Sequence, residues 1–383
     1  MKPFGVYSRF PVEFVEGRDT YLWDREGGKY LDMYGGHAVI SVGHSHPRYI
    51  DRIQSQLQQI GFYSNSVENS HQEMLAEQLG RLSGYTDHSL FLCNSGAEAN
   101  ENAFKLASFH TGRKKVIGFT GGFHGRTSAA VAVTDHPDIR APLNETDNAV
   151  ILPFNEIAPV RQAFQDNDIA AVIVEGIQGI AGVYPPDQDF LRTLRELCDH
   201  YSAILILDEV QSGYGRTGEF FAHKHFGITA DIVTTGKGMG NGFPLAGVVI
   251  SPEIRPFPGM LGSTFGGNHL ACAAGNAVLE IMEDEDLVRR AGEIGNYLLE
   301  NLKKLPGPVR EVRGSGLMIG VELETDVKPV RKRLLEENRV LTGSSARPDT
   351  LRIMPSLTLK RPEADLFIQY FKNLIENLKL NVA

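Results

Sequence analysis

Cysteine is scarce in this sequence, and its spacing excludes two classes of protein. The 383 residues include three cysteines, Cys93, Cys198 and Cys272, which lie far apart along the chain. They form no CxxC pair and no disulfide framework of the kind that small secreted domains use. We therefore expect neither a cysteine-based metal site nor a disulfide-stabilised protein, and the sparse thiols fit a reducing cytoplasm.

Excess positive charge and long apolar runs are also missing. Lysine and arginine total 38 against 47 aspartate and glutamate residues, so the net charge is −9. This balance argues against a nucleic-acid-binding or basic membrane-surface protein. No apolar run approaches the roughly 20 residues of a membrane span, and the start of the chain, MKPFG, lacks the apolar core of a signal peptide. We expect a cytoplasmic protein with no nucleic-acid and no membrane partner.

A complete nucleotide-binding P-loop is missing from the segment that comes nearest to it. Residues 234–244 read TTGKGMGNGFP and place Lys237 among four glycines. The pattern G-x-x-x-x-G-K-[ST] requires glycine where Asp231 stands and Ser or Thr where Gly238 stands. Two interpretations of Lys237 remain, a solvated loop lysine and a Schiff-base lysine with a carbonyl cofactor.

Length and hydrophobic pattern predict a two-domain α/β protein. A chain of 383 residues is too long for one ordinary core. From about residue 88, short apolar strands alternate with helices: strands at 89–92, 115–119, 170–174, 203–207, 232–233 and 246–250, helices at 97–110 and 190–200. Continuous apolar strands indicate a largely parallel sheet with helices on both faces, and such sheets bind ligands beyond the carboxyl ends of their strands.

The expected boundaries are 1–45, 46–265 and 266–383. The N-terminal segment, with a glycine-turn hairpin at 21–24 and 29–33, should pack with a smaller C-terminal α+β domain. The large domain should begin with helices at 48–60 and 70–83. The last segment is expected to contain helices at 269–284, 286–304, 330–338 and 362–378 and strands at 317–322 and 350–354.

Three groups of polar residues stand where strands are predicted to end. Residues 94–100, NSGAEAN, open a helix at Ser95, which is either an anion site for a phosphate or an ordinary N-cap. Asp208 ends an apolar strand, so it either meets a cation or protonated nitrogen or caps the next turn. Residues 121–127, GGFHGRT, offer Phe123 and Arg126 in a flexible loop, which is either a site for a carboxylate or plain surface. His44 and His46 lack further ligands nearby, so a loop is expected there rather than a metal site.

Together these groups specify a cofactor chemistry. A phosphate cradle, a strand-end carboxylate, an aromatic plate and a lysine lodged among glycines are the parts needed to hold pyridoxal 5'-phosphate (PLP). A carboxylate keeps the pyridine nitrogen protonated, and a lysine holds the aldehyde and later moves the proton.

With these motifs in order, the chain resembles the class III (ornithine aminotransferase-like) subgroup of fold-type I PLP enzymes, and most closely the N-acylornithine aminotransferases. The resemblance covers nearly the whole length. It rests on residues 94–100 (NSGAEAN), 123–127 (FHGRT), 208–218 (DEVQSGYGRTG), 235–237 (TGK) and 262–268 (GSTFGGN).

The resemblance implies a role for each matching residue. Lys237 would carry the Schiff base, Asp208 would pair with the pyridine nitrogen, Gln211 would contact the ring hydroxyl region, and Phe123 would stack on the ring. Phosphate contacts would come from Ser95, Gly96, Ala97 and Thr264 of the partner subunit, which makes the active form a homodimer with shared sites. Substrate contacts would come from Arg126, Arg352, Glu175, Ser64 and Asn65, with Arg352 on the carboxylate of glutamate or 2-oxoglutarate.

One departure from the family pattern bears on the substrate. The family commonly reads Glu-Pro-Ile-Gln-Gly-Glu where residues 175–180 read EGIQGI. The second glutamate, replaced by Ile180, is expected to pair with the arginine that matches Arg352. We hypothesise that Arg352 is open to an anionic group in both half-reactions, such as the carboxylate of a succinyl group, because a buried guanidinium without a partner is costly.

The expected function is transamination of the terminal amino group of an N-acetyl- or N-succinylornithine to 2-oxoglutarate in arginine biosynthesis. The enzyme alternatives are ornithine, 4-aminobutyrate or acylated-lysine-pathway aminotransferases, and a semialdehyde aminomutase. A PLP-binding regulatory domain without turnover is the alternative from another class. The acyl group, the oligomer beyond a dimer, and the shares of Arg126 and Arg352 in each half-reaction stay open.

Overall fold

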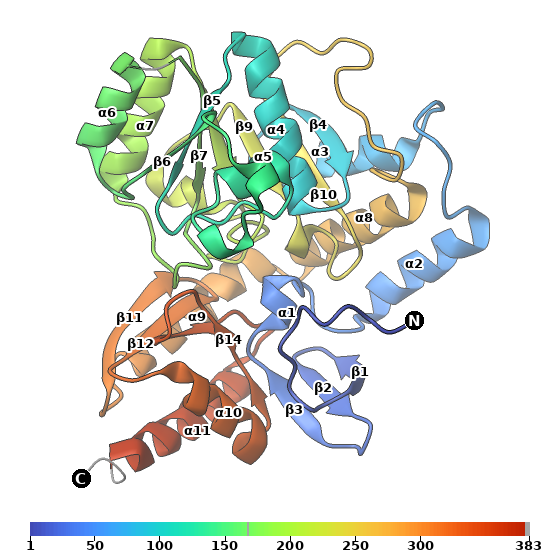
Figure 1. The fold of residues 1–383 in the computed structure, drawn as a ribbon. Coiled ribbons are helices and arrows are strands. Elements are labelled where there is room, and N and C mark those ends of the chain that lie inside the picture. Colours follow the sequence, from blue (N-terminus) through green and yellow to red (C-terminus); the bar gives the residue numbers. More distant parts are fainter. Residues whose placement is uncertain (167, 380–383) are drawn as a thin grey trace.

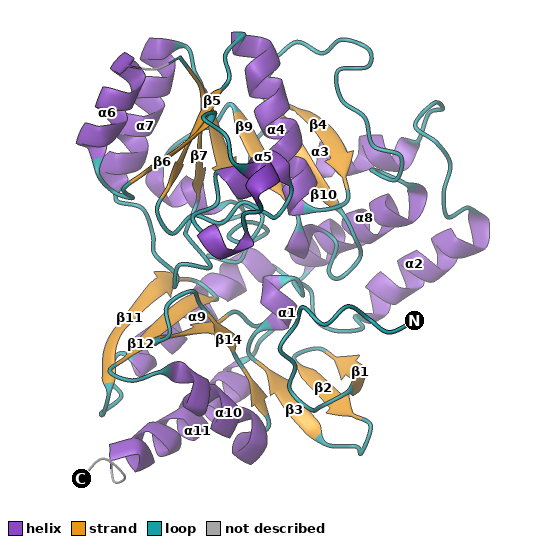
Figure 2. Cartoon of the chain, in the orientation of Figure 1, coloured by secondary structure: helices purple, strands orange, loops and turns teal. Residues whose placement is uncertain are grey.

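The computed structural model describes residues 1–166 and 168–379, which form a larger and a smaller body (Figure 1). The larger body is built around a seven-stranded sheet, and the smaller body contains two four-stranded sheets. Figure 2 shows helices flanking the strands in both bodies.

The central sheet has the strand order β4-β10-β9-β8-β7-β5-β6. Its strands are β4 Ser89–Cys93, β5 Lys115–Phe119, β6 Ala149–Leu152, β7 Ile169–Glu175, β8 Ile204–Asp208, β9 Ile232–Thr235 and β10 Ala246–Ile250. The neighbours from β6 to β9 pair in parallel, whereas β10 pairs antiparallel with both β9 and β4. The sheet is therefore largely parallel, as expected.

Helices cover both faces of this sheet, because alternate residues of a buried strand point to opposite sides. Ala171 and Ile173 of β7 join the apolar cluster of α4 Gly96–Thr111, whereas Val172 and Val174 join the cluster of α7 Gln188–Tyr201. The other helices of the larger body are α2 Pro47–Gln59, α3 Ser70–Ser83, α5 Ser128–Ala132, α6 Ile157–Asp166 and α8 His269–Asp284. These contacts confirm the expected α/β architecture.

The smaller body joins the beginning and the end of the chain. Strand β3 pairs in parallel with β13, so that Leu31 lies opposite Val340. One sheet contains β1 Phe14–Arg18, β2 Tyr21–Asp24, β3 Lys29–Asp32 and β13 Val340–Leu341, and the other contains β11 Val309–Ser315, β12 Met318–Leu323, β15 Thr350–Ile353 and β14 Gly343–Ser344. The helices are α1 Gly35–Ala38, α9 Leu287–Leu302, α10 Val327–Asn338 and α11 Arg361–Lys379.

Several elements lie outside the expectations from the sequence. The edge strand β6 has only four residues, AVIL, and is only partly buried. Strand β11 reads VREVRGS, so charged residues interrupt its apolar ones and it contains no continuous apolar run. The short α1 is distorted, since Gly36 and His37 both have positive φ, 56° and 68°. Strand β10 runs antiparallel, a direction that its apolar run alone does not specify.

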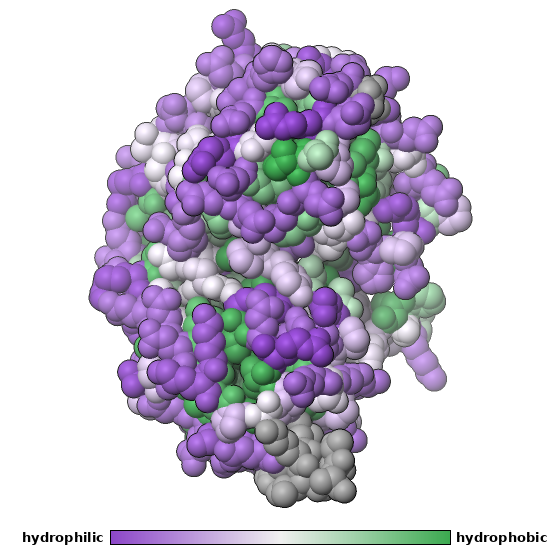
Figure 3. Space-filling view, turned by 90° about the vertical axis from the view of Figure 1, so that its left-hand side faces the viewer, coloured by the Kyte–Doolittle hydropathy of each residue, from purple (hydrophilic) through white to green (hydrophobic). Residues whose placement is uncertain are grey.

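The visible surface has no continuous apolar band. Hydrophilic side chains cover most of the face in Figure 3, and hydrophobic ones gather there in separate small areas. Across the described ranges, no helix combines the length and apolarity needed to cross a bilayer. Nor do the histidines, cysteines and acidic residues of those ranges gather in groups of three suited to a metal ion.

Candidate active site

A cavity of about 640 Å³ brings together most of the residues singled out in the sequence. It is lined at the carboxyl ends of β7 and β8 by Glu175 and Asp208, which fits the rule for ligand sites in parallel sheets. Its lining includes Gly96, Ala97, Phe123, Arg126, Glu175, Asp208, Gln211, Lys237 and Arg352 from the predicted set, and also Tyr7, Tyr34, His37, His124 and Ile180.

Lys237 follows the buried strand β9 and enters the cavity from a strained position. Its φ is 43°, a value that non-glycine residues rarely adopt and that recurs at functional sites. Burial lowers the pKa of the Lys237 amine, and the charge of Arg352 lowers it too, while Asp208 and Glu175 act in the opposite direction. A lowered pKa leaves more of the amine unprotonated, which is the form that attacks a carbonyl carbon.

Asp208 is a buried carboxylate held on one side by fixed groups. Its Oδ2 accepts a hydrogen bond from Asn100 Nδ2 at 2.9 Å and lies 2.8 Å from His124 Nδ1, and its Oδ1 accepts from the Val210 N–H at 3.0 Å. These contacts fix the orientation of the carboxylate where it borders the cavity. A buried carboxylate so oriented suits a protonated ring nitrogen.

Glu175 lies close to Lys237 and Asp208. Burial raises the pKa of its carboxyl to about 7, and the nearby negative charge of Asp208 also raises it. Its oxygens accept hydrogen bonds from the Phe123 N–H at 3.0 Å and the Gly179 N–H at 2.8 Å. Glu175 therefore ties the Phe123 loop to the end of β7.

Helix α4 begins at the cavity. The Ser95 side chain accepts from the Glu98 N–H at 3.2 Å, and the Glu98 carboxylate accepts from the Ser95 N–H at 3.1 Å, so Ser95 forms a capping box. The next two residues, Gly96 and Ala97, line the cavity and leave the positive end of the helix directed at it. Gly96 is required because a Cβ there would lie 2.5 Å from Val210 Cγ1.

Two guanidinium groups reach the cavity in different surroundings. Arg126 is exposed, with its Cζ 5.4 Å from the Phe123 ring centroid. Arg352 is 1% exposed and donates a hydrogen bond to Gln211 Oε1 at 3.2 Å. Gln211 also donates to the His37 carbonyl at 3.2 Å, so in this structure its side chain is bound to protein groups.

Four of the predicted site residues do not line this cavity: Ser95, which caps α4, and Ser64, Asn65 and Thr264. Thr264 is exposed and lines a separate cavity of about 330 Å³ with Asn94 and Glu98. Asn65 donates to the carbonyls of Ser263 and Gly266, and the Ser64 hydroxyl lies 2.6 Å from that of Ser66. Ser64, Asn65 and Thr264 thus share one exposed region away from Lys237, and their roles stay predictions.

Several residues of the site had no role predicted from the sequence. Asn100 and His124 hold Asp208, and both stand inside motifs that the sequence singled out, so their positions carried a signal. Tyr7, Tyr34 and His37 line the cavity from the N-terminal segment, which shows no motif for such a role. Their placement depends on how the ends of the chain pack.

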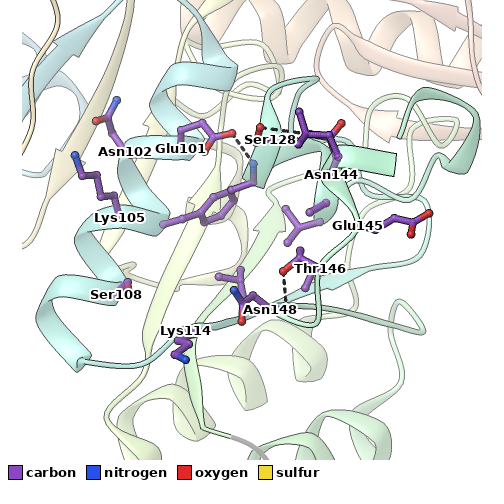
Figure 4. Close-up of a pocket in the computed structure, with 17 residues that line it drawn as sticks. Glu101, Asn102, Lys105, Ser108, Lys114, Ser128, Asn144, Glu145, Thr146 and Asn148 are labelled. Atoms are coloured by element: carbon purple, nitrogen blue, oxygen red, sulfur yellow. Dashed lines mark hydrogen bonds between the residues drawn. The ribbon is translucent and has the colours of Figure 1, made fainter. Parts of the chain in front are cut away.

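A second cavity lies between α4 and the segment that contains Ser128 and Asn144 (Figure 4). Its volume is about 540 Å³, and Lys105 on α4 and Asn144 on the opposite segment are among its lining residues. Glu101 accepts hydrogen bonds there from the N–H groups of Ala129 and Ala130, at 2.8 and 3.0 Å. None of the predicted site residues lines this cavity.

The groups around Lys237 fit PLP. The start of α4 offers amide N–H groups to a phosphate, Asp208 offers a carboxylate to the ring nitrogen, and the Phe123 ring lies within the same cavity. Lysine, carboxylate and helix terminus are together the donor set of an enzyme that uses PLP.

Comparison with known proteins agrees with this class. The model of the family described as "Aminotransferase class-III" matches residues 6–375. The acetylornithine aminotransferase of Bacillus subtilis is 38% identical over 377 residues, which cover 97% of this chain and 97% of the relative. That of Methanopyrus kandleri is 41% identical and covers 94% of this chain and 93% of the relative. The chain belongs to the class III aminotransferase family, and it is a PLP-dependent aminotransferase.

Solved structures agree in fold. The ornithine aminotransferase of Toxoplasma gondii superposes with a TM-score of 0.93 at 28% identity, covering 99% of this chain and 93% of that one. The acetylornithine aminotransferase of Elizabethkingia anophelis gives a TM-score of 0.86 at 29% identity, covering 98% and 96%. Fold type I, expected from the resemblance, is confirmed.

Proposed function

We propose that this enzyme transfers the terminal amino group of an N-acylornithine to 2-oxoglutarate, giving N-acylglutamate 5-semialdehyde and glutamate in cytoplasmic arginine biosynthesis. The observation that carries the proposal is the pair of guanidinium groups, Arg126 and Arg352, in one cavity with Lys237. Two cationic groups suit substrates that carry carboxylates in addition to the reacting amine or ketone. The names of the closely matching relatives support the N-acylornithine as donor.

Each proposed role follows from the position of the residue. When bound, PLP supplies an aldehyde for the amine and a ring that takes up electrons. Lys237 holds the cofactor and then, as an amine of lowered pKa, moves a proton at the substrate carbon. Asp208 keeps the ring nitrogen protonated, Phe123 and Gln211 fix the ring, and Gly96 and Ala97 bind the phosphate at the start of α4.

We propose the succinylated form of the donor, and the lining of the cavity supports this choice. Ile180 lines the cavity together with Arg352, and its apolar side chain offers no charge to the guanidinium. No carboxylate of the described residues forms an ion pair with Arg352, whose hydrogen-bond acceptors are all neutral groups. A donor with a second carboxylate can use that charge.

Visible absorbance tests the proposal without a coupled assay. PLP-loaded enzyme is mixed with one amino donor at a time: N-acetylornithine, N-succinylornithine, ornithine or 4-aminobutyrate. Loss of the yellow band reports amino transfer from that donor. We expect N-succinylornithine to bleach the band fastest; fastest bleaching by N-acetylornithine would assign the acetyl form.

Lys237→Ala serves as the control for this test. The variant should bind PLP without a covalent link and should show no turnover with any donor. Bleaching by ornithine or 4-aminobutyrate alone would reject the N-acylornithine donor, and turnover by Lys237→Ala would reject the role of Lys237.

We further propose a homodimer in which Thr264 of the partner subunit completes the phosphate site. Thr264 is exposed in its own chain and does not line the Lys237 cavity. Next to it, Phe265 is 60% exposed and pairs with Phe62, with ring centroids 5.4 Å apart. Exposed aromatic pairs are typical of surfaces that another chain covers.

A further inference from the structure

The buried Arg352 is held by neutral groups. Its Nε donates to the Ser344 carbonyl at 2.5 Å, its Nη1 to Gln211 Oε1 at 3.2 Å, and its Nη2 to the Tyr34 hydroxyl at 3.1 Å. A guanidinium has five N–H donors, so one on each terminal nitrogen is left without a partner in the described part of the chain. Two such donors are what a carboxylate needs to bind end-on.

The Tyr34 ring is fixed beside Arg352 by the backbone around it. A Cβ at Gly343 would lie 2.1 Å from Tyr34 Cε2, so the ring fits only because residue 343 is glycine. The ring centroid lies 5.7 Å from Arg352 Cζ. The His37 ring centroid lies 4.8 Å from that of Tyr34, with Nδ1 2.5 Å from the Tyr34 hydroxyl.

The three residues form one chain of hydrogen bonds with a defined direction. Arg352 can only donate, so the Tyr34 oxygen accepts from it and the Tyr34 proton is free for His37 Nδ1. This arrangement needs a neutral His37. Partial burial lowers the pKa of His37, and the charges of Arg352 and Lys237 lower it further. Burial also raises the pKa of Tyr34, so the hydroxyl keeps its proton.

We propose that Tyr34 and His37 are positioning residues that orient Arg352 as a carboxylate clamp and leave its charge uncompensated throughout the reaction. A carboxylate partner would orient the guanidinium equally well but would compete with the substrate for it. A tyrosine hydroxyl backed by a neutral imidazole supplies the orientation alone. The clamp makes the enzyme selective for dicarboxylate keto acids and for amino donors that place a carboxylate at Arg352. This inference rests on the proposed function.

Tyr34→Phe tests the clamp, because phenylalanine keeps the ring against Gly343 and removes only the hydroxyl. The readout is the dissociation constant of glutarate, a dicarboxylate without a reacting group, measured by calorimetry on PLP-loaded enzyme. A hydrogen bond to a charged group justifies an expected weakening of roughly 10-fold. The KM for 2-oxoglutarate should rise by a similar factor while kcat, the visible band and the thermal midpoint stay the same.

Tyr184→Phe is the matched control. The Tyr184 hydroxyl donates to Glu322 at 3.4 Å, and Tyr184 does not line the Lys237 cavity. This variant should bind glutarate like the unaltered enzyme. Equal glutarate binding by Tyr34→Phe and the unaltered enzyme would overturn the proposal.

His37→Gly tests the second member of the chain, since glycine accepts the φ of 68° without strain. As a single substitution, His37→Gly should weaken glutarate binding. Added to Tyr34→Phe, it should cause no further weakening. If the two substitutions weakened glutarate binding additively, the chain of hydrogen bonds from His37 through Tyr34 to Arg352 would be overturned. The bleaching experiment tests the amino donor separately. If N-acylornithines failed to bleach the band, the proposed function would be rejected. Glutarate binding would still show whether Tyr34 and His37 orient Arg352.

Discussion

At the scale of the residue, the site is a set of buried charges, each with specific partners. Asp208 is 4% exposed and is satisfied by Asn100, His124 and the Val210 amide. Arg352 is surrounded by oxygen atoms of neutral groups. An isolated buried charge is too costly to persist, so these contacts are what allows the charged forms to remain in the cavity.

Glu175 yields a prediction about stability and pH. Its pKa is about 7 in the folded chain against 4.5 as the ordinary value. Between these values the folded state binds more protons than the unfolded state, so the free energy of unfolding falls as pH rises, by at most about 1.4 kcal/mol per pH unit. Glutamine has no proton to lose. In cofactor-free protein, the thermal midpoint of Glu175→Gln relative to the unaltered chain should therefore be higher at pH 7 than at pH 5; an equal difference at both values would contradict the raised pKa.

Ile180→Glu tests whether the open guanidinium selects the acyl group. A glutamate at this position would line the same cavity as Arg352 and should compete with a substrate carboxylate for the guanidinium. We expect bleaching by N-succinylornithine to slow roughly 10-fold or more, as a lost charged contact of 1.5–3 kcal/mol predicts, and bleaching by N-acetylornithine to slow less. Ile180→Gln is the uncharged control. Equal slowing of both donors would reject the hypothesis.

At the scale of the element, the sequence predicts what depends on local pattern. The strands β5, β7, β8 and β10 consist mostly of apolar residues, so their positions were predictable. The start of α4 was predictable too, because Ser95 and Glu98 form a capping box there. The antiparallel direction of β10 and the pairing of β3 with β13 depend on contacts between distant segments, which no local pattern records.

The same division holds for the site. Lys237, Asp208 and Phe123 stand in motifs with distinctive composition, and the structure brings them to one cavity. Tyr34 and His37 reach that cavity through a short distorted helix whose residues have positive φ, and the conformation is set by packing rather than by composition. Residues of this kind are visible only once the chain is folded.

Two glycines of α9 offer a matched pair of variants at this scale. A Cβ at Gly295 would lie 2.1 Å from the carbonyl carbon of Gly316, whereas one at Gly292 would meet only Gly218 Cα at 3.5 Å. Gly295→Ala must push the β11–β12 turn away and should cost about 1–3 kcal/mol. Gly292→Ala should stabilise the helix by about 0.5–1 kcal/mol. Thermal midpoints should shift in opposite directions, and a harmless Gly295→Ala would contradict the close packing of α9 against this turn.

At the scale of the whole molecule, exposed aromatic residues point to a partner surface. Besides Phe62 and Phe265, Phe109 and Phe257 are about half exposed, and their ring centroids lie 5.4 Å apart. Both pairs include a residue from the segment between β10 and α8, which also contains Thr264. A second copy of the chain placed there would cover this apolar surface. In the proposed dimer, each chain would bring its Thr264 to the Lys237 cavity of the other chain.

The proposed sharing of sites between two subunits predicts complementation between two defective chains. In a mixed dimer of Lys237→Ala and Thr264→Ala chains, one site contains both substitutions, and the other combines an intact Lys237 with an intact Thr264 of the partner subunit. That second site should bind PLP as tightly as the unaltered enzyme does, whereas Thr264→Ala homodimers should need more PLP for half-saturation. The measurement is PLP titration followed by the visible band after subunits are mixed and the mixed dimer is isolated through a tag on one chain. If Thr264 served its own chain, every intact Lys237 in the mixed dimer would lie in a site with Thr264→Ala, and the weak PLP binding of the Thr264→Ala homodimer would persist.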